Sequence, residues 1–200
     1  LIRWVSNLTA GVGFLVSLPL WFWYDTQDAG WQFVERHEWI PSIGAEYFIG
    51  VDGFSALLIL LATLMGAIAV LSSWTAITER LKEYYIFLLV LQTGMIGAFV
   101  SLDFLLFFVF WEVMLVPMYF LIGIWGSANR LYSAIKFFLY TLFGSILMLI
   151  AILMLYHGSD QGDGPTFSLV RLAEMASSRE LLSGTNQSIA FWLLFVGFAI

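Results

Sequence analysis

Long apolar segments, separated by shorter polar ones, dominate the chain. The segments that we read as membrane-spanning helices cover residues 4–24, 54–73, 84–102, 104–126, 131–156 and 189–200. A helix rises about 1.5 Å per residue, so about 20 residues cross a hydrocarbon layer about 30 Å thick. The last segment is too short to cross, and the chain lacks an initial Met, so we expect a piece of a longer protein. We predict an all-α, polytopic transmembrane helix bundle that forms one domain over residues 1–200.

Composition narrows the class of protein. The chain is 61% hydrophobic and 11% charged, which excludes an ordinary soluble domain. It has no cysteine, so it has no ligands for a Cys-held iron–sulfur cluster, and its two histidines, His37 and His157, lie in or beside loops. We therefore expect no redox cofactor on this chain. The net charge of −6 comes mainly from loops, and we expect no nucleic-acid partner.

The basic residues favour one orientation. With Leu1 in the cytoplasm, the cytoplasmic segments hold Arg3, Arg80, Lys82 and Arg130. The opposite side holds Arg36, Arg171 and Arg179. These totals barely differ, but the cytoplasmic loops are far shorter, and short loops are the ones that follow the positive-inside rule. We therefore expect the amino-terminal end in the cytoplasm.

Two outer loops carry local structure signals. Residues 25–52 are rich in aromatic side chains, which is typical of an interfacial belt or of a loop packed over helix ends. The Pro/Gly punctuation at 41–44 predicts a short extended hairpin there. Residues 168–175 have apolar side chains at helical spacing and predict a surface helix capped by Ser168. Asp52 is a candidate N-cap for the helix that follows it.

Small residues recur at intervals of four within two of the predicted helices. They are Ala62 and Gly66 in the second segment, and Thr93, Gly97 and Ser101 with Gly94 and Ala98 in the third. Such spacing lets helix backbones approach closely in a membrane. We interpret these residues as packing positions without chemistry of their own.

Glu112 is the strongest candidate for chemistry. It lies in an otherwise uncharged run, residues 104–129, about 13 Å from Asp103 and near the middle of the hydrocarbon layer. A carboxylate at that depth costs about 2.5–3.5 kcal/mol on insertion scales. Burial favours the neutral acid and a nearby cation favours the carboxylate, which is the sensitivity that a proton carrier needs. The alternative is a neutral acid that only joins helices by hydrogen bonding.

Lys136 is the second candidate. It lies about 9 Å inside the cytoplasmic boundary near Arg130. It is interpreted either as an inward ammonium that relays protons or pairs with Glu112, or as a lysine whose stem reaches back to the interface. The contact with Glu112 is inferred from depth alone. Asp103 and His157 are expected at the interface, at the outer ends of their helices.

The residues around Glu112 also resemble a known family. FWEVMLVPMYFLIGIWG (residues 110–126), AIKFFLYTLFGS (134–145) and GVDGFS (50–55) resemble the antiporter-like membrane subunits of respiratory complex I, most closely the M-type or chain 4 subunits. The resemblance implies a larger fold with inverted repeats of helices, of which this chain is a fragment. It also implies that Glu112 carries protons beside a lysine of a neighbouring helix. The family's principal lysine position falls beyond Ile200, and Lys136 matches a further lysine position.

The resemblance implies a proton-translocating subunit of NADH:quinone oxidoreductase, so the chain would be part of an enzyme without carrying a redox centre. NADH, FMN, iron–sulfur clusters and quinone are then expected in partner subunits. Other membrane subunits and the lipid bilayer are the expected partners, and a bacterial plasma membrane is favoured over the mitochondrial inner membrane. Two alternatives stay open: a subunit of a multisubunit cation/proton antiporter, and a purely structural membrane scaffold.

Overall fold

The computed structural model describes residues 1–28, 30–162, 164–178 and 181–200. Arg179, one of the basic residues assigned to the outer side, lies outside these described residues. Every predicted apolar segment contains one helix: α1 Ile2–Trp23, α2 Gly53–Ala76, α3 Leu81–Val100, α4 Phe104–Trp125, α5 Arg130–Gly158 and α7 Gly184–Ala199. The largest difference is at the start of α7, which was predicted at residue 189 and begins at Gly184. Helices α1 to α5 are long and apolar enough to cross a membrane, and the predicted helix bundle is confirmed.

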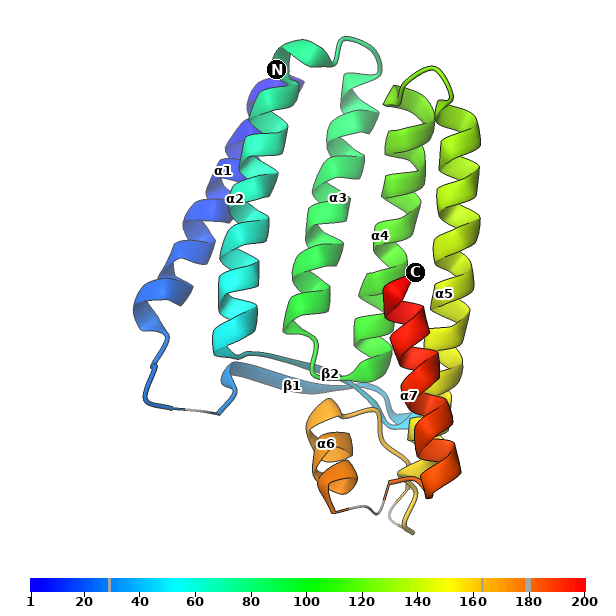
Figure 1. The fold of residues 1–200 in the computed structure, drawn as a ribbon. Helices are drawn as coiled ribbons and strands as arrows, with labels where there is room; N and C mark the ends of the chain where they lie inside the picture. Colours follow the sequence, from blue (N-terminus) through cyan, green and yellow to red (C-terminus); the bar gives the residue numbers. More distant parts are fainter. Residues whose placement is uncertain (29, 163, 179–180) are drawn as a thin grey trace.

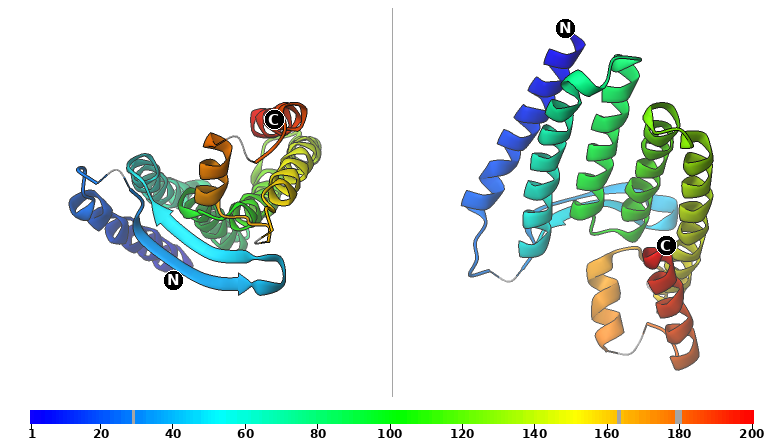
Figure 2. Two further views of the ribbon diagram at one scale, coloured as in Figure 1. Left: turned by 90° about the horizontal axis from the view of Figure 1, so that it is seen from below. Right: turned by 45° about the horizontal axis from the view of Figure 1, so that its top comes forward.

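The long helices form one curved row. Figure 1 shows α1 to α5 side by side in chain order, with α7 beside α5, and the view from below shows the curvature of the row (Figure 2, left). A single row leaves much of each helix uncovered, and large apolar side chains such as Leu8, Leu57 and Leu139 are more than half exposed. In a membrane these faces meet lipid or other helices, because both are as apolar as the side chains themselves.

Glycines let neighbouring helices in the row approach closely. A Cβ built on Gly94 would lie 2.6 Å from the side chain of Met114 of α4, and one on Gly66 would lie 2.5 Å from the Gln92 amide. A Cβ on Gly97 would overlap the ring of Phe110 of α4. The packing role predicted for these glycines is confirmed. Thr93 differs: it is exposed and donates to the carbonyl of Leu89 in its own helix.

A β-hairpin crosses the ends of α2, α3 and α4 that lie opposite the amino terminus of the chain. Strand β1 (Gln32–Ile40) pairs antiparallel with β2 (Ala45–Val51) through the short 3-10 turn η1 (Pro41–Ile43). Gly44 ends the turn in the left-handed conformation, with φ of 64°, which costs glycine little. Strand β2 contacts α2, α3 and α4 (Figure 1). The predicted hairpin is confirmed, and this part of the aromatic loop packs over helix ends.

Two predicted helix caps are also confirmed. Asp52 accepts a hydrogen bond from the backbone N–H of Ser55, whose hydroxyl accepts from Asp52 N–H in return, forming a capping box on α2. Ser168 accepts from the N–H of Arg171 and caps the surface helix α6 (Leu169–Ser177). Both caps satisfy N–H groups that the first turn of a helix leaves without an intrahelical partner.

Candidate functional site

Glu112 lies in the middle of α4, where every other residue of the helix is uncharged. It is half-buried, and one of its carboxylate oxygens, Oε1, accepts a hydrogen bond from the hydroxyl of Ser145 on α5. Ser145 is 2% exposed, so this bond lies inside the interface between the two helices. A hydrogen bond to an ionised group is stronger than one between neutral groups. The structure therefore provides a polar partner for Glu112 on the neighbouring helix.

Aromatic side chains of α4 and α7 contact each other near Glu112. The ring of Trp111 meets the ring of Phe198 edge to face, with centroids 5.5 Å apart. Phe107, one turn earlier on α4, lies 5.9 Å from the same Phe198 ring. These ring contacts pack α7 against α4 beside the residue that carries the carboxylate.

Lys136 lies at the predicted distance from the start of α5, but it makes no ion pair with Glu112. It is exposed in the second turn of α5, with its ammonium 6.0 Å from the centroid of the Tyr132 ring. Ser145 is nine residues further along α5, about 13 Å along the helix axis. Across the described ranges the one ion pair is Arg36–Glu46 in the hairpin. The expected contact between Glu112 and Lys136 is therefore absent, and Ser145 occupies the position next to the carboxylate.

Ser145 was not singled out from the sequence, although it is the last residue of the motif that supports the family resemblance. A serine in an apolar helix usually bonds a carbonyl of its own helix, so its residue type gave no signal. Thr141, one turn earlier on α5, follows that rule and donates to the carbonyl of Phe137 at 2.8 Å. Only the packing of α5 on α4 distinguishes the two hydroxyls.

Asp103 lies at the end of its helix, as predicted, and it is a fully buried N-cap of α4. Its side chain is 0% exposed and accepts from the N–H groups of Leu105 at 2.9 Å, Leu106 at 3.0 Å and Glu46 at 3.1 Å. The first two bonds cap α4, and the third ties the hairpin strand β2 to this helix. His157, in contrast, is exposed at the end of α5 beside Tyr156.

Backbone bonds on either side of Asp103 complete a junction of three segments. Leu102 N–H donates to the carbonyl of Phe48 in β2, and the carbonyl of Leu102 accepts from Leu169 N–H, each at 2.8 Å. Phe104 N–H donates to the carbonyl of Phe167, also at 2.8 Å. Residues 102–104 therefore hold the hairpin and the segment before α6 against the start of the helix that carries Glu112.

The buried carboxyl of Asp103 makes this junction sensitive to pH. Burial raises the pKa of Asp103, because it disfavours the charged form; the N–H groups of Leu106, Glu46 and Leu105 oppose the rise, and the Glu46 charge adds to it. The folded state therefore binds this proton more tightly than the unfolded chain does. Its contribution to stability is largest below the unfolded pKa near 3.8 and decreases as the pH rises through the folded pKa.

We expect the thermal stability of the protein in detergent to fall, through this group, as the pH rises from about 4 toward neutrality. Asp103→Asn is expected to remove that slope, because an amide does not titrate in this range. The variant also loses stability at every pH, since its NH₂ group faces the N–H of Glu46. An unchanged slope in Asp103→Asn would show that another group controls the pH dependence.

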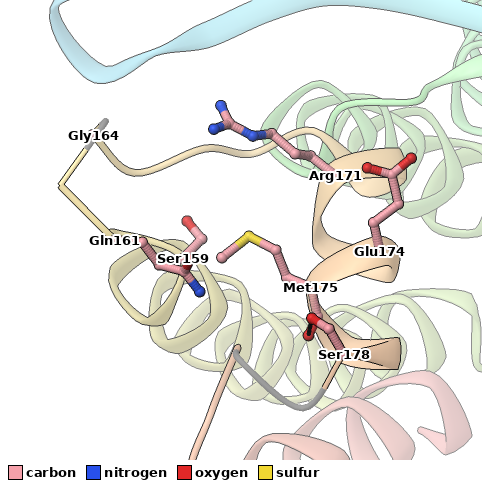
Figure 3. A pocket seen from close by; sticks show the side chains of 7 residues that line it. All are labelled: Ser159, Gln161, Gly164, Arg171, Glu174, Met175 and Ser178. Carbon is pink, nitrogen blue, oxygen red and sulfur yellow. Dashed lines mark hydrogen bonds between the residues drawn. The ribbon is translucent and has the colours of Figure 1, made fainter.

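A polar pocket of about 270 Å³ lies between the end of α5 and the surface helix α6. Figure 3 shows Arg171, Glu174 and Met175 of α6 on one side and Ser159 on the other. Within the described parts of the chain, no group of three or more His, Cys, Asp or Glu side chains is placed to hold a metal ion. The pocket is open to solvent and contains none of the residues around Glu112.

Comparison with known proteins gives consistent matches. The family described as NADH:quinone oxidoreductase/Mrp antiporter, TM, matches residues 101–200. NADH-quinone oxidoreductase subunit M of Rhodobacter capsulatus is 41% identical over 201 residues, covering 99% of this chain and 39% of that protein. The Rickettsia conorii subunit M is 35% identical over 199 residues, covering 100% and 39%. The chain therefore spans about two fifths of the length of these curated relatives.

Solved structures share the same fold. A chain of respiratory complex I from Thermus thermophilus with bound NADH has a TM-score of 0.83 and 28% identity, covering 98% of this chain and 39% of that chain. A chain of the Mrp complex from a Dietzia species has a TM-score of 0.80 and covers 98% of this chain and 20% of that chain. Its identity is 19%, so that likeness concerns the fold alone.

Proposed function

Because this chain belongs to the NADH:quinone oxidoreductase/Mrp antiporter membrane family, we propose that it is part of a proton-translocating subunit of NADH:quinone oxidoreductase. The observation that carries the proposal is the carboxylate of Glu112, held halfway along the uncharged helix α4 by a hydroxyl of α5. An ionisable group at membrane depth marks an ion or proton pathway by default. The names of the curated relatives support NADH and quinone as the redox partners of the whole complex.

In this proposal the redox chemistry takes place in partner subunits, which hold NADH, FMN, iron–sulfur clusters and quinone. Glu112 takes up a proton from one side of the membrane and releases it toward the other. Ser145 holds Oε1, and the second carboxylate oxygen, Oε2, accepts the proton. A membrane potential of 100 mV opposes the transfer by about 2.3 kcal/mol per proton. Charge and conformational changes transmitted from neighbouring membrane subunits supply that free energy.

The membrane is proposed to be a bacterial plasma membrane, because the relatives reported above are bacterial. Five helices of suitable length and apolarity support a multi-pass protein. The cytoplasmic side is assigned to the end that carries Arg3, Arg80 and Arg130, opposite the hairpin. Short loops with basic residues stay on that side during insertion.

Lys136 is proposed as a secondary charge that tunes the site from a distance. At about 13 Å and an effective dielectric constant near 20, its charge changes the energy of a carboxylate by about 1 kcal/mol. We expect Lys136→Gln to lower proton uptake by about fivefold at most. Lys82→Gln, at the start of α3, is the control and should have little effect. A loss in Lys136→Gln as complete as that caused by removing Glu112 would contradict this assignment and make Lys136 an essential proton carrier.

A cation/proton antiporter subunit is the second candidate, because the family description names Mrp antiporters and the fold matches a chain of an Mrp complex. Sealed membrane vesicles that contain the complete subunit in its native complex separate the two functions. We expect NADH oxidation to drive proton uptake without added sodium. Proton movement that depends on a sodium gradient and ignores NADH would instead identify an antiporter. If neither driving force moves protons through the assembled complex, the subunit is a scaffold.

A further inference from the structure

We propose that Ser145 is a positioning residue for Glu112. The position of Ser145 is in turn set by the contact between α5 and α7 at Gly144 and Gly197. The proposal deepens the proposed function and rests on it, since it concerns the same carboxylate. Ser145 does not itself carry the transported proton, and its effect on transport passes through Glu112. It acts by holding one carboxylate oxygen in a fixed place.

The hydroxyl of Ser145 has an uncommon hydrogen-bond acceptor for a serine within a helix. Within a helix, serine and threonine hydroxyls normally donate to the carbonyl four residues earlier, as Thr141 does on this helix. Ser145 instead donates across the helix interface to Oε1 of Glu112. It is almost fully buried, so water competes little for the hydroxyl. The carbonyl of Thr141, four residues earlier in the same helix, is a second acceptor. It can accept the hydrogen bond of the Ser145 hydroxyl when Glu112 does not.

The residue before Ser145 lies in a close backbone contact between α5 and α7. A Cβ built on Gly144 would lie 3.1 Å from the carbonyl oxygen of Gly197, and a Cβ on Gly197 would lie 3.0 Å from the carbonyl oxygen of Gly144. The two backbones thus touch where α7 passes beside α5 (Figure 1). Met148, fully buried one turn later on α5, packs on the same side of Gly197. A displacement of α7 is therefore passed directly to the turn of α5 that carries Ser145.

These contacts connect three helices in series. Helix α7 fixes the backbone of α5 at Gly144, Ser145 follows in the same turn, and its hydroxyl reaches Glu112 on α4. A hydrogen bond stabilises a carboxylate more than the neutral acid. Moving α7 closer or further away then changes how readily Glu112 releases its proton. The position of α7 thereby affects proton release through Gly144 and Ser145.

The test uses the complete subunit assembled in its native complex in sealed vesicles, with NADH-driven proton uptake measured across a pH series. We expect Ser145→Ala to shift the midpoint of the pH profile upward by about one pH unit, because the carboxylate loses a charge-assisted bond. Ser17→Ala is the matched control. Ser17 also makes a buried interhelical bond, to the Thr63 hydroxyl at 2.8 Å, but it has no ionisable partner there, so its midpoint should not move.

A second readout does not depend on pumping. The infrared band of the protonated Glu112 carboxyl, identified by its loss in Glu112→Gln, should move to higher wavenumber in Ser145→Ala and stay in place in Ser17→Ala. Gly197→Ala should shift the pH midpoint in the same direction, because its new Cβ presses on Gly144. Gly123→Ala, whose Cβ would meet Ala134 at an ordinary 3.5 Å, should not.

An unchanged midpoint and an unmoved band in Ser145→Ala would overturn the positioning role. Equal shifts in Ser145→Ala and Ser17→Ala would also overturn it, because the effect would then be a general loss of packing. An effect in Ser145→Ala without one in Gly197→Ala would remove α7 from the proposal. If Glu112→Gln itself leaves pumping intact, the proposed function fails; if it stops pumping while Ser145→Ala changes nothing, only the present inference fails.

Discussion

Glu112→Gln in the complete, assembled subunit is expected to reduce NADH-driven proton uptake at least tenfold. Glutamine has nearly the same size as glutamate, and its carbonyl oxygen can still accept the hydrogen bond from the Ser145 hydroxyl. The packing of α4 on α5 is therefore retained while the exchangeable proton is lost. Uptake and NADH oxidation should be recorded together in sealed vesicles, so that a pumping defect is separated from a general loss of activity.

Glu46→Gln provides the control for this substitution. Glu46 lies in the hairpin and pairs with Arg36 at 2.7 Å near the surface, and exposed pairs contribute about 0–1 kcal/mol. We expect the Glu46→Gln complex to pump normally. If the Glu112→Gln complex also assembles and pumps at the normal rate, the carboxylate only joins helices, and the scaffold alternative replaces proton transport.

Asp103→Ala is expected to cause the largest loss of stability among single substitutions of this chain. It removes the acceptors of three backbone N–H groups, those of Glu46, Leu105 and Leu106. An unsatisfied buried donor costs about 1–3 kcal/mol, so three of them cost about 3–9 kcal/mol if all of them stay buried. The hairpin and the start of α4 would separate, and the yield of folded subunit in the complex should fall severely. Thermal unfolding in detergent and the fraction of assembled complex measure the effect.

Asp52→Ala is the matched control for that loss. Asp52 caps α2 in the same way, but it is half-buried and its side chain accepts from one residue, Ser55. Loss of an ordinary N-cap costs about 0.5–2 kcal/mol. Similar losses of stability in the two alanine variants would show that the link from Asp103 to the hairpin contributes little.

Much of the fold was predictable because its signals are local. Uncharged runs of about 20 residues identify membrane helices, since the unsatisfied backbone of any other conformation is too costly in lipid. The cap at Asp52, the helix that begins after Ser168 and the turn at Pro41–Gly44 depend on residues within one turn of the chain. The depth of Glu112 along its helix was set by counting residues from Asp103.

The partners of these residues were not predictable in the same way. Counting along a helix gives a depth but no direction, so the contact between Glu112 and Lys136 did not follow from it. Ser145 meets Glu112 because α5 packs on α4, and Asp103 is buried because the hairpin folds back over it. Neither contact has a signature near the residue itself.

The sequence by itself determined the number and approximate length of the apolar helices, the caps at Asp52 and Ser168, and the presence of a carboxylate within an otherwise uncharged helix, because each depends on neighbours along the chain. The tertiary structure decided which hydroxyl reaches Glu112, how closely α7 approaches α5, and that Asp103 joins three segments. Glu112 and Ser145 are 33 positions apart in the sequence, and Glu46 and Asp103 are 57 positions apart. Pairings over such separations depend on how whole helices pack, which is a property of the assembled bundle.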